Sequence, residues 1–412
     1  MKKYGILVLL LFFLAGGFLY TKTPLAEPPV QGNGVAPEYL LQIMPADARH
    51  ERTITWQASA GAIEGVLELR QGGSAAEKFL AAPECLPEKE KNRRIYTVHL
   101  TGLQPGTFYE YRSVSAGQAT AWHGFKTEAE GAGSFKALIF GDSQCADYTV
   151  WGRTSQAAWL KHPDAAFFIN MGDLVDNGES FDQWKSWMDA ASPLLDAIPV
   201  APVQGNHEAY SLDWKKALPK NYLALFAVPK NGPAGLEKYA YSYDYGPVHF
   251  AVLNTQQEEL GNWLPDLLER QKKWLEADLA GSMKPWKIVL MHRGIWKFPP
   301  DGRLDAVGDA FVPIFDRCHV DVVFTAHVHA YARTKPLRGG NRVQENGTVY
   351  ITTGRSGDKV WERSPQKPWD EVFHNPLNQA NYLVLEAAAD KLTVMAWQEN
   401  GELLDQFALV KN

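Results

Sequence analysis

The sequence predicts an α/β domain preceded by an all-β domain, and three observations lead to this fold class. Residues 37–127 contain short runs of alternating polar and apolar side chains separated by glycine and proline turns, a pattern typical of a β-sandwich. Residues 128–134 (EAEGAGS) form a linker of small residues. Beyond this linker, apolar runs of strand length alternate with helical stretches, as in an α/β sheet. We therefore expect domains at residues 35–128 and 134–412.

The first 34 residues resemble neither domain. Lys2 and Lys3 precede an apolar run over residues 5–20, which is typical of an export signal. Residues 15–17 (AGG) offer the small side chains of a cleavage site, and a proline- and glycine-rich tether follows. If left uncleaved, the run is slightly short for a bilayer span but could anchor the chain. We expect an exported protein that is secreted, periplasmic or membrane-anchored on the extracytoplasmic face.

The composition excludes several classes of protein. Of 412 residues, 45% are hydrophobic and 21% charged, which is an ordinary globular balance. The net charge of −6 gives no electrostatic signature of nucleic-acid binding. Three cysteines cannot all pair within one chain, which excludes a disulfide scaffold. We favour buried free thiols for Cys85, Cys145 and Cys318, with a Cys85–Cys145 bridge as the alternative.

Individual elements can also be expected. Within the all-β region, Leu103, Pro105 and Tyr109 fit a tyrosine corner, in which the phenol bonds to the chain a few residues upstream, and Trp56 fits a core position. In the α/β region, the clearest helix begins at Pro265, because proline is favoured in a first turn, and it ends near residue 281. Its apolar face predicts packing against a sheet.

Five apolar runs of strand length each end in a cluster of metal-binding residue types. The clusters are residues 141–144 (GDSQ), 172–178 (GDLVDNG), 205–208 (GNHE), 291–294 (MHRG) and 326–329 (AHVH). Each cluster alone is a weak signal, since an aspartate after a strand often caps a helix and an Asn-His pair can form a turn. The loops at the carboxyl ends of strands converge in α/β sheets, so the five clusters together predict one metal site.

The motif order GDxx, GDxxD, GNHE, MHR and xHxH resembles the calcineurin-like metallophosphoesterase superfamily, and more specifically the purple acid phosphatases. Those proteins join a fibronectin-III-like domain to a catalytic domain in which two sheets form a β-sandwich flanked by helices, with the metals at one edge. The resemblance covers nearly everything from residue 37 onward, including residues 100–107 (LTGLQPGT), 241–246 (YSYDYG) and 347–351 (GTVYI).

The resemblance implies a dinuclear centre. Its expected ligands are Asp173 bridging both metals, Asp142 and His329 on the first, and Asn206, His292 and His327 on the second. Carboxylate, amide and imidazole ligands suit transition metals such as Fe, Mn or Zn. Two such ions bind phosphoryl oxygens and generate a hydroxide nucleophile near neutral pH. We expect His207 to stabilise the transition state or to protonate the leaving oxygen. Gln144 could be a weak ligand of the first metal or a partner of a ligand.

The sequence also departs from the purple acid phosphatase pattern. Asp176 stands where those enzymes have the tyrosine that gives iron(III) its colour, so iron(III) is less expected and the protein should not be purple. The GDxxD spacing resembles the serine/threonine phosphoprotein phosphatases, which predicts a hydrogen bond between Asp176 and His207. The alternative is a carboxylate that caps its own turn. Arg293 or Arg303 could bind phosphate in a bidentate manner, although surface roles fit equally well.

These observations predict a metal-dependent phosphomonoesterase, acid-phosphatase-like, that acts outside the cytoplasm on small organic phosphates. A phosphodiesterase or nucleotidase with the same metal centre is the nearest alternative. A more distant alternative is a non-catalytic binding or adhesion protein. Such a protein should lack a ligand, and none of the expected ligands is missing from the sequence.

Overall fold

The structure, a computed structural model, describes residues 37–59, 64–81, 83–85, 93–131, 133–297 and 302–411. The expected export signal and tether, within residues 1–34, lie outside these ranges. Among the described residues, no helix has both the length and the apolar character needed to cross a membrane.

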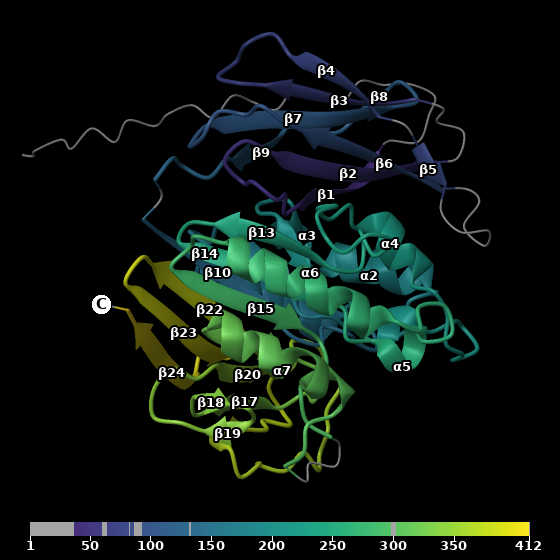
Figure 1. The fold of residues 1–412 in the computed structure, drawn as a ribbon. Helices are drawn as coiled ribbons and strands as arrows, with labels where there is room; N and C mark the ends of the chain where they lie inside the picture. The colour runs from purple at the N-terminus through teal and green to yellow at the C-terminus, as the bar shows by residue number, and fades with distance from the viewer. Residues whose placement is uncertain are drawn as a thin grey trace, which may run out of the picture.

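The N-terminal region is all-β, as predicted, and forms two facing sheets (Figure 1). One sheet contains β1 (Glu38–Ile43), β2 (Arg52–Ser59), β6 (Arg93–Leu100) and β5 (Pro83–Cys85). The other contains β4 (Glu77–Ala81), β3 (Gly65–Arg70), β7 (Phe108–Ser115), β8 (Gln118–Ala119) and β9 (His123–Lys126). Trp56 is buried in the core between them, where its ring stacks on Tyr96 at a centroid distance of 5.4 Å. The backbone N–H of Gln104 donates to the Tyr109 hydroxyl at 2.9 Å, which confirms the tyrosine corner.

The all-β region shares a sheet with the rest of the chain. Strand β1 pairs with β2 on one side and with β12 (Val200–Pro202) on the other, where the Met44 N–H donates to the Val200 carbonyl at 2.9 Å. The strands that continue this sheet past β12 are β11 (Phe167–Asn170), β10 (Ser134–Phe140), β22 (Asn381–Ala388), β23 (Lys391–Gln398) and β24 (Leu403–Val410). The sequence pattern did not predict this continuity.

A second large sheet faces the first. In order, its strands are β13 (Tyr241–Tyr245), β14 (Val248–Leu253), β15 (Trp286–Met291), β16 (Val322–Thr325), β20 (Val349–Thr353), β17 (Tyr331–Thr334) and β21 (Asp370–His374). A small hairpin of β18 (Leu337–Arg338) and β19 (Asn341–Arg342) lies beside it. Side chains of β14 alternate, with Phe250 in the core between the sheets and Ala251 in the core under the helices. Because β14 is buried on both faces, its sequence is apolar except for His249.

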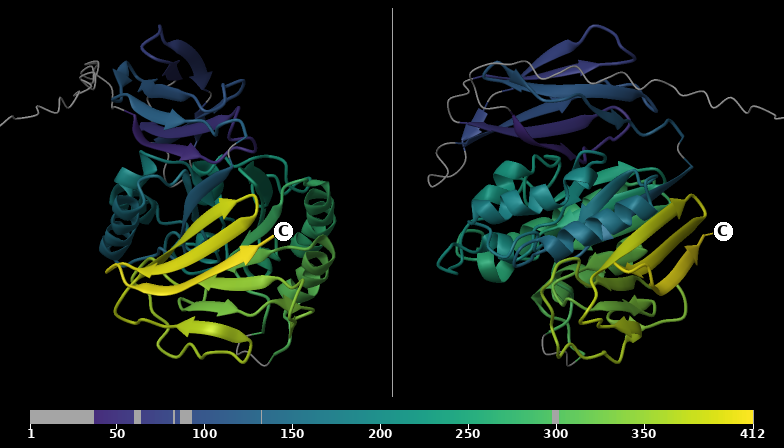
Figure 2. Two further views of the ribbon diagram at one scale, coloured as in Figure 1. Left: turned by 90° about the vertical axis from the view of Figure 1, so that its left-hand side faces the viewer. Right: turned by 180° about the vertical axis from the view of Figure 1, so that it is seen from behind.

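Helices cover the outer faces of this two-sheet sandwich (Figures 1 and 2). The helices are α1 (Thr149–Lys161), α2 (Phe181–Ala190), α3 (Ser192–Leu195), α4 (Lys220–Leu225), α5 (Gln257–Leu260), α6 (Leu267–Gly281), α7 (Ala306–Cys318) and the short 3₁₀ turn η2 (His207–Ala209). Helix α6 begins two residues after the expected Pro265 and buries Leu268, Leu275 and Leu279 against the second sheet, as its apolar face predicted. The α/β fold class with two sheets flanked by helices is confirmed.

Cys145 and Cys318 are buried free thiols, as the favoured interpretation predicted for these two residues. The predicted state of the Cys85 thiol lies outside the described side chains. Cys145 therefore forms no bridge with Cys85.

The parallel strands determine where the functional loops lie. Strands β10, β11 and β12 run parallel to one another, as do β15 and β16 in the facing sheet. Each of these five strands is followed by one of the five predicted clusters. Since the two sheets pack face to face, the loops at their carboxyl ends meet at one edge of the sandwich.

Candidate metal centre

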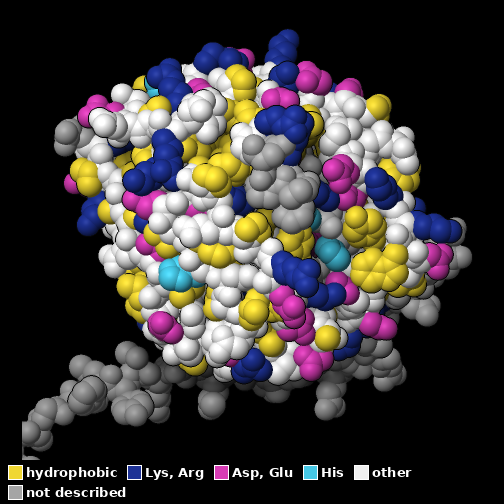
Figure 3. Space-filling view, turned by 90° about the horizontal axis from the view of Figure 1, so that it is seen from below, with side chains coloured by type: hydrophobic (Ala, Val, Ile, Leu, Met, Phe, Trp, Pro, Cys, Tyr) yellow, Lys and Arg dark blue, Asp and Glu magenta, His cyan; other side chains and the backbone are white. Residues whose placement is uncertain are grey.

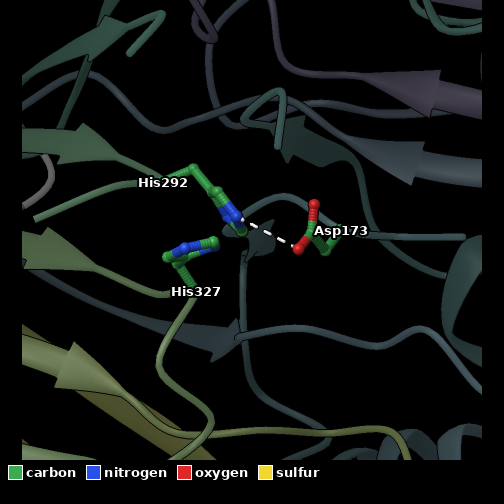
Figure 4. A group of neighbouring side chains, drawn as sticks. All are labelled: Asp173, His292 and His327. Atoms are coloured by element: carbon green, nitrogen blue, oxygen red, sulfur yellow. Dashed lines mark ion pairs between the residues drawn. The ribbon is translucent and has the colours of Figure 1, made fainter. Parts of the chain in front are cut away.

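The structure brings the acidic and imidazole side chains of these loops into two overlapping groups. Asp173, His292 and His327 form one group, and Asp142, Asp173 and His329 form the other, with the ligand atoms of each group within 4.8 Å of one another. The first group points inward from three separate strand ends (Figure 4), with His292 Nε2 3.2 Å from Asp173 Oδ2. In the second group, His329 Nε2 lies 3.3 Å from Asp142 Oδ1. Asp173 belongs to both groups, which is the position expected of a bridging ligand.

Two side-chain amides border these groups. The Asn206 Oδ1 atom lies 3.2 Å from His292 Nε2. Asn206 therefore joins the group of Asp173, His292 and His327, the residues expected at the second metal. The Gln144 amide nitrogen lies 3.4 Å from His329 Nε2, while its Oε1 atom is buried without a hydrogen-bond partner in the described residues. Oxygen and nitrogen of an amide are exchanged by a simple flip, which would turn the unpartnered oxygen toward His329. All seven residues expected at the metals therefore lie at one place.

The loops reach this arrangement through unusual backbone conformations. Asp142, Asp173, His327 and His329 all have positive φ angles, of 40°, 51°, 70° and 59°. The left-handed region costs a residue with a Cβ about 1–2 kcal/mol, and such strain is typical of functional sites. Neighbouring glycines provide the space: a Cβ on Gly205 would lie 2.2 Å from Asp173 Oδ1, and one on Gly172 would lie 2.6 Å from His292 Nδ1. Gly172 and Gly205 are thus steric requirements of the site.

The two histidines next to the carboxylates are held in one tautomer. His292 Nδ1 lies 2.9 Å from the Met171 carbonyl, and His329 Nδ1 lies 2.9 Å from the Lys359 carbonyl. A carbonyl oxygen only accepts, so each Nδ1 carries a proton and each Nε2 atom faces the carboxylates. Burial lowers the pKa of His292, but Asp173 outweighs this effect and raises it to about 9. The buried carboxylates therefore favour positive charge at the position where a metal ion fits.

Glu208 links two of the loops through hydrogen bonds to their backbone N–H groups. Its buried carboxylate accepts hydrogen bonds from the N–H groups of Asp173 (3.0 Å), Leu174 (2.8 Å) and Gly205 (2.7 Å). Burial and the nearby Asp173 carboxylate raise the pKa of Glu208 to about 7. This role of Glu208 was not predicted from the sequence. A glutamate in a loop that follows a buried strand is the signal that could have identified it, because a buried carboxylate needs donors.

One predicted contact is wrong in its acceptor. His207 Nδ1 donates to the backbone carbonyl of Asp176 at 2.6 Å, whereas the Asp176 carboxylate lies 3.5 Å away. That carboxylate instead pairs with the Lys359 ammonium at 2.6 Å, an ion pair that the sequence pattern did not indicate. The backbone N–H of His207 also donates to Asp173 Oδ1 at 2.9 Å. With Nδ1 occupied, His207 has its Nε2 atom available for a substrate.

The two candidate arginines differ in position. Arg293 donates to the buried Glu259 carboxylate at 2.8 Å, and its Nη1 atom lies 3.4 Å from His327 Nε2. It is therefore fixed beside the imidazole and acidic side chains of the site. Arg303 lies in the segment before α7 with an exposed side chain. The face seen from below shows histidines among interspersed acidic, basic and hydrophobic side chains (Figure 3).

Comparison with known proteins identifies the domain that carries this geometry. Residues 135–331, which include all five strand-end loops, match the family model "Calcineurin-like phosphoesterase". The chain contains a calcineurin-like phosphoesterase domain. The resemblance noted in the sequence motifs is thereby confirmed.

The relatives of this phosphoesterase extend over both regions of the chain. Purple acid phosphatase 22 of Arabidopsis thaliana is 26% identical over 366 residues, covering 85% of this chain and 79% of the relative. Acid phosphatase type 7 of Mus musculus is 25% identical over 361 residues, covering 77% of each chain. These homologues and the matched domain indicate a purple acid phosphatase-like metallophosphoesterase, a family with a dinuclear metal centre.

Solved structures share the fold of the phosphoesterase. The purple acid phosphatase PPD1 from yellow lupin (Lupinus luteus) superposes with a TM-score of 0.79 at 20% identity, covering 92% of this chain and 75% of the lupin chain. The structure of PhoD gives a TM-score of 0.61 at 12% identity, covering 89% of this chain and 91% of that one. At these identities, the likeness concerns the fold alone.

Proposed function

We propose that the protein is a phosphomonoesterase that hydrolyses small organic phosphates with two transition-metal ions. The observation that carries the proposal is the pair of acid–histidine groups that share Asp173. In our assignment, the first ion takes Asp142, Asp173 and His329, with Gln144 beside it, and the second takes Asp173, Asn206, His292 and His327.

The donor set supports this assignment. It combines carboxylates, an amide and imidazoles whose Nε2 atoms are directed by carbonyl bonds at Nδ1, a combination suited to Fe, Mn or Zn. When bound, two such ions would activate water and polarise the phosphoryl oxygens. Asp176 supplies no phenolate, and we propose that the metal-loaded protein is not purple.

The chain's own residues then handle the proton and the charge. Hydrolysis adds one water across the P–O bond, with the hydroxyl going to phosphorus and a proton to the departing alcohol. We assign the delivery of that proton to His207 Nε2, since its Nδ1 is fixed on the Asp176 carbonyl at 2.6 Å. Arg293 adds positive charge near His327, which favours the dianionic phosphoryl group of a monoester. The names of the relatives, purple acid phosphatase and acid phosphatase, also support a monoester substrate.

The test compares esters and metals in one experiment. Protein stripped of metal and reloaded with Fe, Mn or Zn is assayed with 4-nitrophenyl phosphate and with bis(4-nitrophenyl) phosphate, and its metal content is measured. We expect two ions per chain and a higher kcat/KM for the monoester. A preference for the diester would replace this proposal with a phosphodiesterase that uses the same residues.

We also propose a domain organisation and a location. Residues 35–128 would form a fibronectin-III-like domain, supported by the tyrosine corner and the pairing of β3 with β7, and residues 134–412 would form the catalytic domain. The N-terminal pattern supports export, with residues 5–20 as a cleaved signal or an anchor. Cell fractionation combined with the intact mass of the exported protein distinguishes these two fates.

A further inference from the structure

A short turn places a tryptophan beside the candidate proton donor. The Trp214 ring lies 6.0 Å from the His207 ring, centroid to centroid, at an interplanar angle of 88°. Tyr210 completes the cluster, with its ring 5.8 Å from His207 and 6.2 Å from Trp214. Although it touches the site, the Trp214 side chain is 55% exposed. A large apolar surface next to a reactive group is typical of a ligand-binding wall.

The backbone at Trp214 is strained. Its φ angle is 56°, a conformation that glycine, asparagine or aspartate adopts far more easily than a bulky residue. The turn is nevertheless well fixed, because the Trp214 N–H donates to the Ser211 carbonyl at 2.8 Å and Tyr210 pairs with Lys216 at its base. A bulky, exposed side chain in this conformation costs stability without adding core packing. We take this as a second and independent indication of a role in binding.

The position of Trp214 suggests what it binds. If His207 protonates the leaving oxygen, the carbon attached to that oxygen lies next to His207. The rest of the alcohol then extends over the neighbouring side chain, and Trp214 is such a neighbour. Indole rings stack on flat aromatic groups. We propose that Trp214 is a specificity-determining residue that stacks on a flat aromatic group in the alcohol portion of a phosphate monoester, an inference that rests on the proposed function.

Trp361 provides an informative contrast. Its ring lies 5.4 Å from His327 and 5.5 Å from His329, so it packs on two of the proposed metal ligands. Trp263 is also exposed, at 43%, but shows no ring contact with a site histidine in the part of the chain that the structure describes. Substituting each tryptophan therefore tests a different role. Trp214 tests stacking on the alcohol, Trp361 tests support of the metal ligands, and Trp263 tests the effect of an exposed tryptophan away from the site.

The experiment uses metal-loaded protein and two esters of primary alcohols, 2-phenylethyl phosphate and ethyl phosphate, which differ in the aromatic ring. We expect Trp214→Ala to lower the ratio of their kcat/KM values about fivefold to tenfold, the size of one aromatic contact, and Trp214→Phe to preserve most of the ratio. Trp361→Ala should lower both rates together, and Trp263→Ala should change neither. An unchanged ratio in Trp214→Ala, whatever the absolute rates, overturns the inference.

A binding measurement separates this inference from the proposed function. Titration calorimetry with 2-phenylethylphosphonate and ethylphosphonate, which cannot be hydrolysed, reports stacking without turnover. We expect wild-type protein to bind the aromatic phosphonate more tightly, and Trp214→Ala to lose about fivefold or more of that advantage. A protein that shows this preference yet hydrolyses neither ester keeps the stacking contact of Trp214 and refutes the phosphomonoesterase proposal. Equal affinity of wild-type protein for both phosphonates refutes the inference alone.

Discussion

Replacing Asp173 by asparagine should affect the two proposed metals unequally. Asp173 Oδ1 accepts the His207 N–H at 2.9 Å, while Oδ2 faces His292 Nε2 at 3.2 Å. The asparagine oxygen should keep the bond to His207, because an amide nitrogen cannot accept it. The amide NH₂ then takes the place of Oδ2 and faces His292. In Asp173→Asn, the second metal would therefore lose an oxygen ligand, and both metals would lose the negative charge of the shared carboxylate.

The size of the effect follows from the loss of a direct ligand. Removing a partner of a ligand costs about 10–100-fold in metal affinity or activity, so removing the ligand itself should exceed about 100-fold for the second metal. Elemental analysis should find close to one ion per chain, and turnover of 4-nitrophenyl phosphate should be abolished. In metal-free protein, the pKa of His292 should fall from about 9, because Asp173 contributes most to raising it.

The matched control is Asp164→Asn, which removes an exposed carboxylate paired with Lys136. This variant should keep two ions and full turnover, since surface ion pairs contribute little. If Asp173→Asn retained two tightly bound ions and turnover within tenfold of wild type, Asp173 would not be the shared ligand. The assignment of both metals would then be wrong.

Three further predictions concern other parts of the chain. His207→Ala should keep both ions but lower kcat about 10²-fold or more, and full activity in this variant would contradict its role as proton donor. Gly205→Ala places a Cβ 2.2 Å from Asp173 Oδ1, so we expect weaker metal binding and a lower Tm, with unchanged values excluding the close approach. For His249, burial lowers the pKa and two hydrogen-bonded aspartates outweigh it, raising the pKa to about 9. Because this value exceeds the unfolded one, the stabilisation is complete below about pH 6.5 and is lost as pH rises through 9. Thermal unfolding should show the advantage of wild type over His249→Gln, about 2 kcal/mol, disappearing by pH 10, and a gap independent of pH would refute the charged pair.

The residues of the site could be predicted because metal-binding residue types directly follow apolar runs of strand length in the sequence. Asp142, Asp173 and His292 each follow an apolar run, and the convergence of strand ends in α/β folds brings such residues together without any knowledge of their contacts. The tyrosine corner and helix α6 were predictable for a different reason, because their sequence signals are local.

Contacts that depend on loop conformation could not be predicted. Whether His207 meets the carboxylate or the carbonyl of Asp176 depends on the path of one loop and on the competing Lys359 ammonium, which is 183 residues away in the chain. The role of Glu208 likewise depends on several N–H groups that turn toward it only in the folded state. Pairing of β1 with β12 joins residues far apart, and neither strand's alternation specifies its neighbour.

The β1–β12 pairing also limits how the protein can be divided. The Val200 carbonyl accepts the Met44 N–H, so deleting the N-terminal region would leave β12 with an unpaired edge. Unpaired strand edges recruit other chains, so a catalytic fragment that starts at residue 134 should be prone to aggregation. The next strand in the sheet, β11, leads directly into the loop that carries Asp173. A less stable β11 would therefore displace that loop and disturb the metal centre. We therefore expect the N-terminal strands to stabilise the strands that carry the metal-site loops.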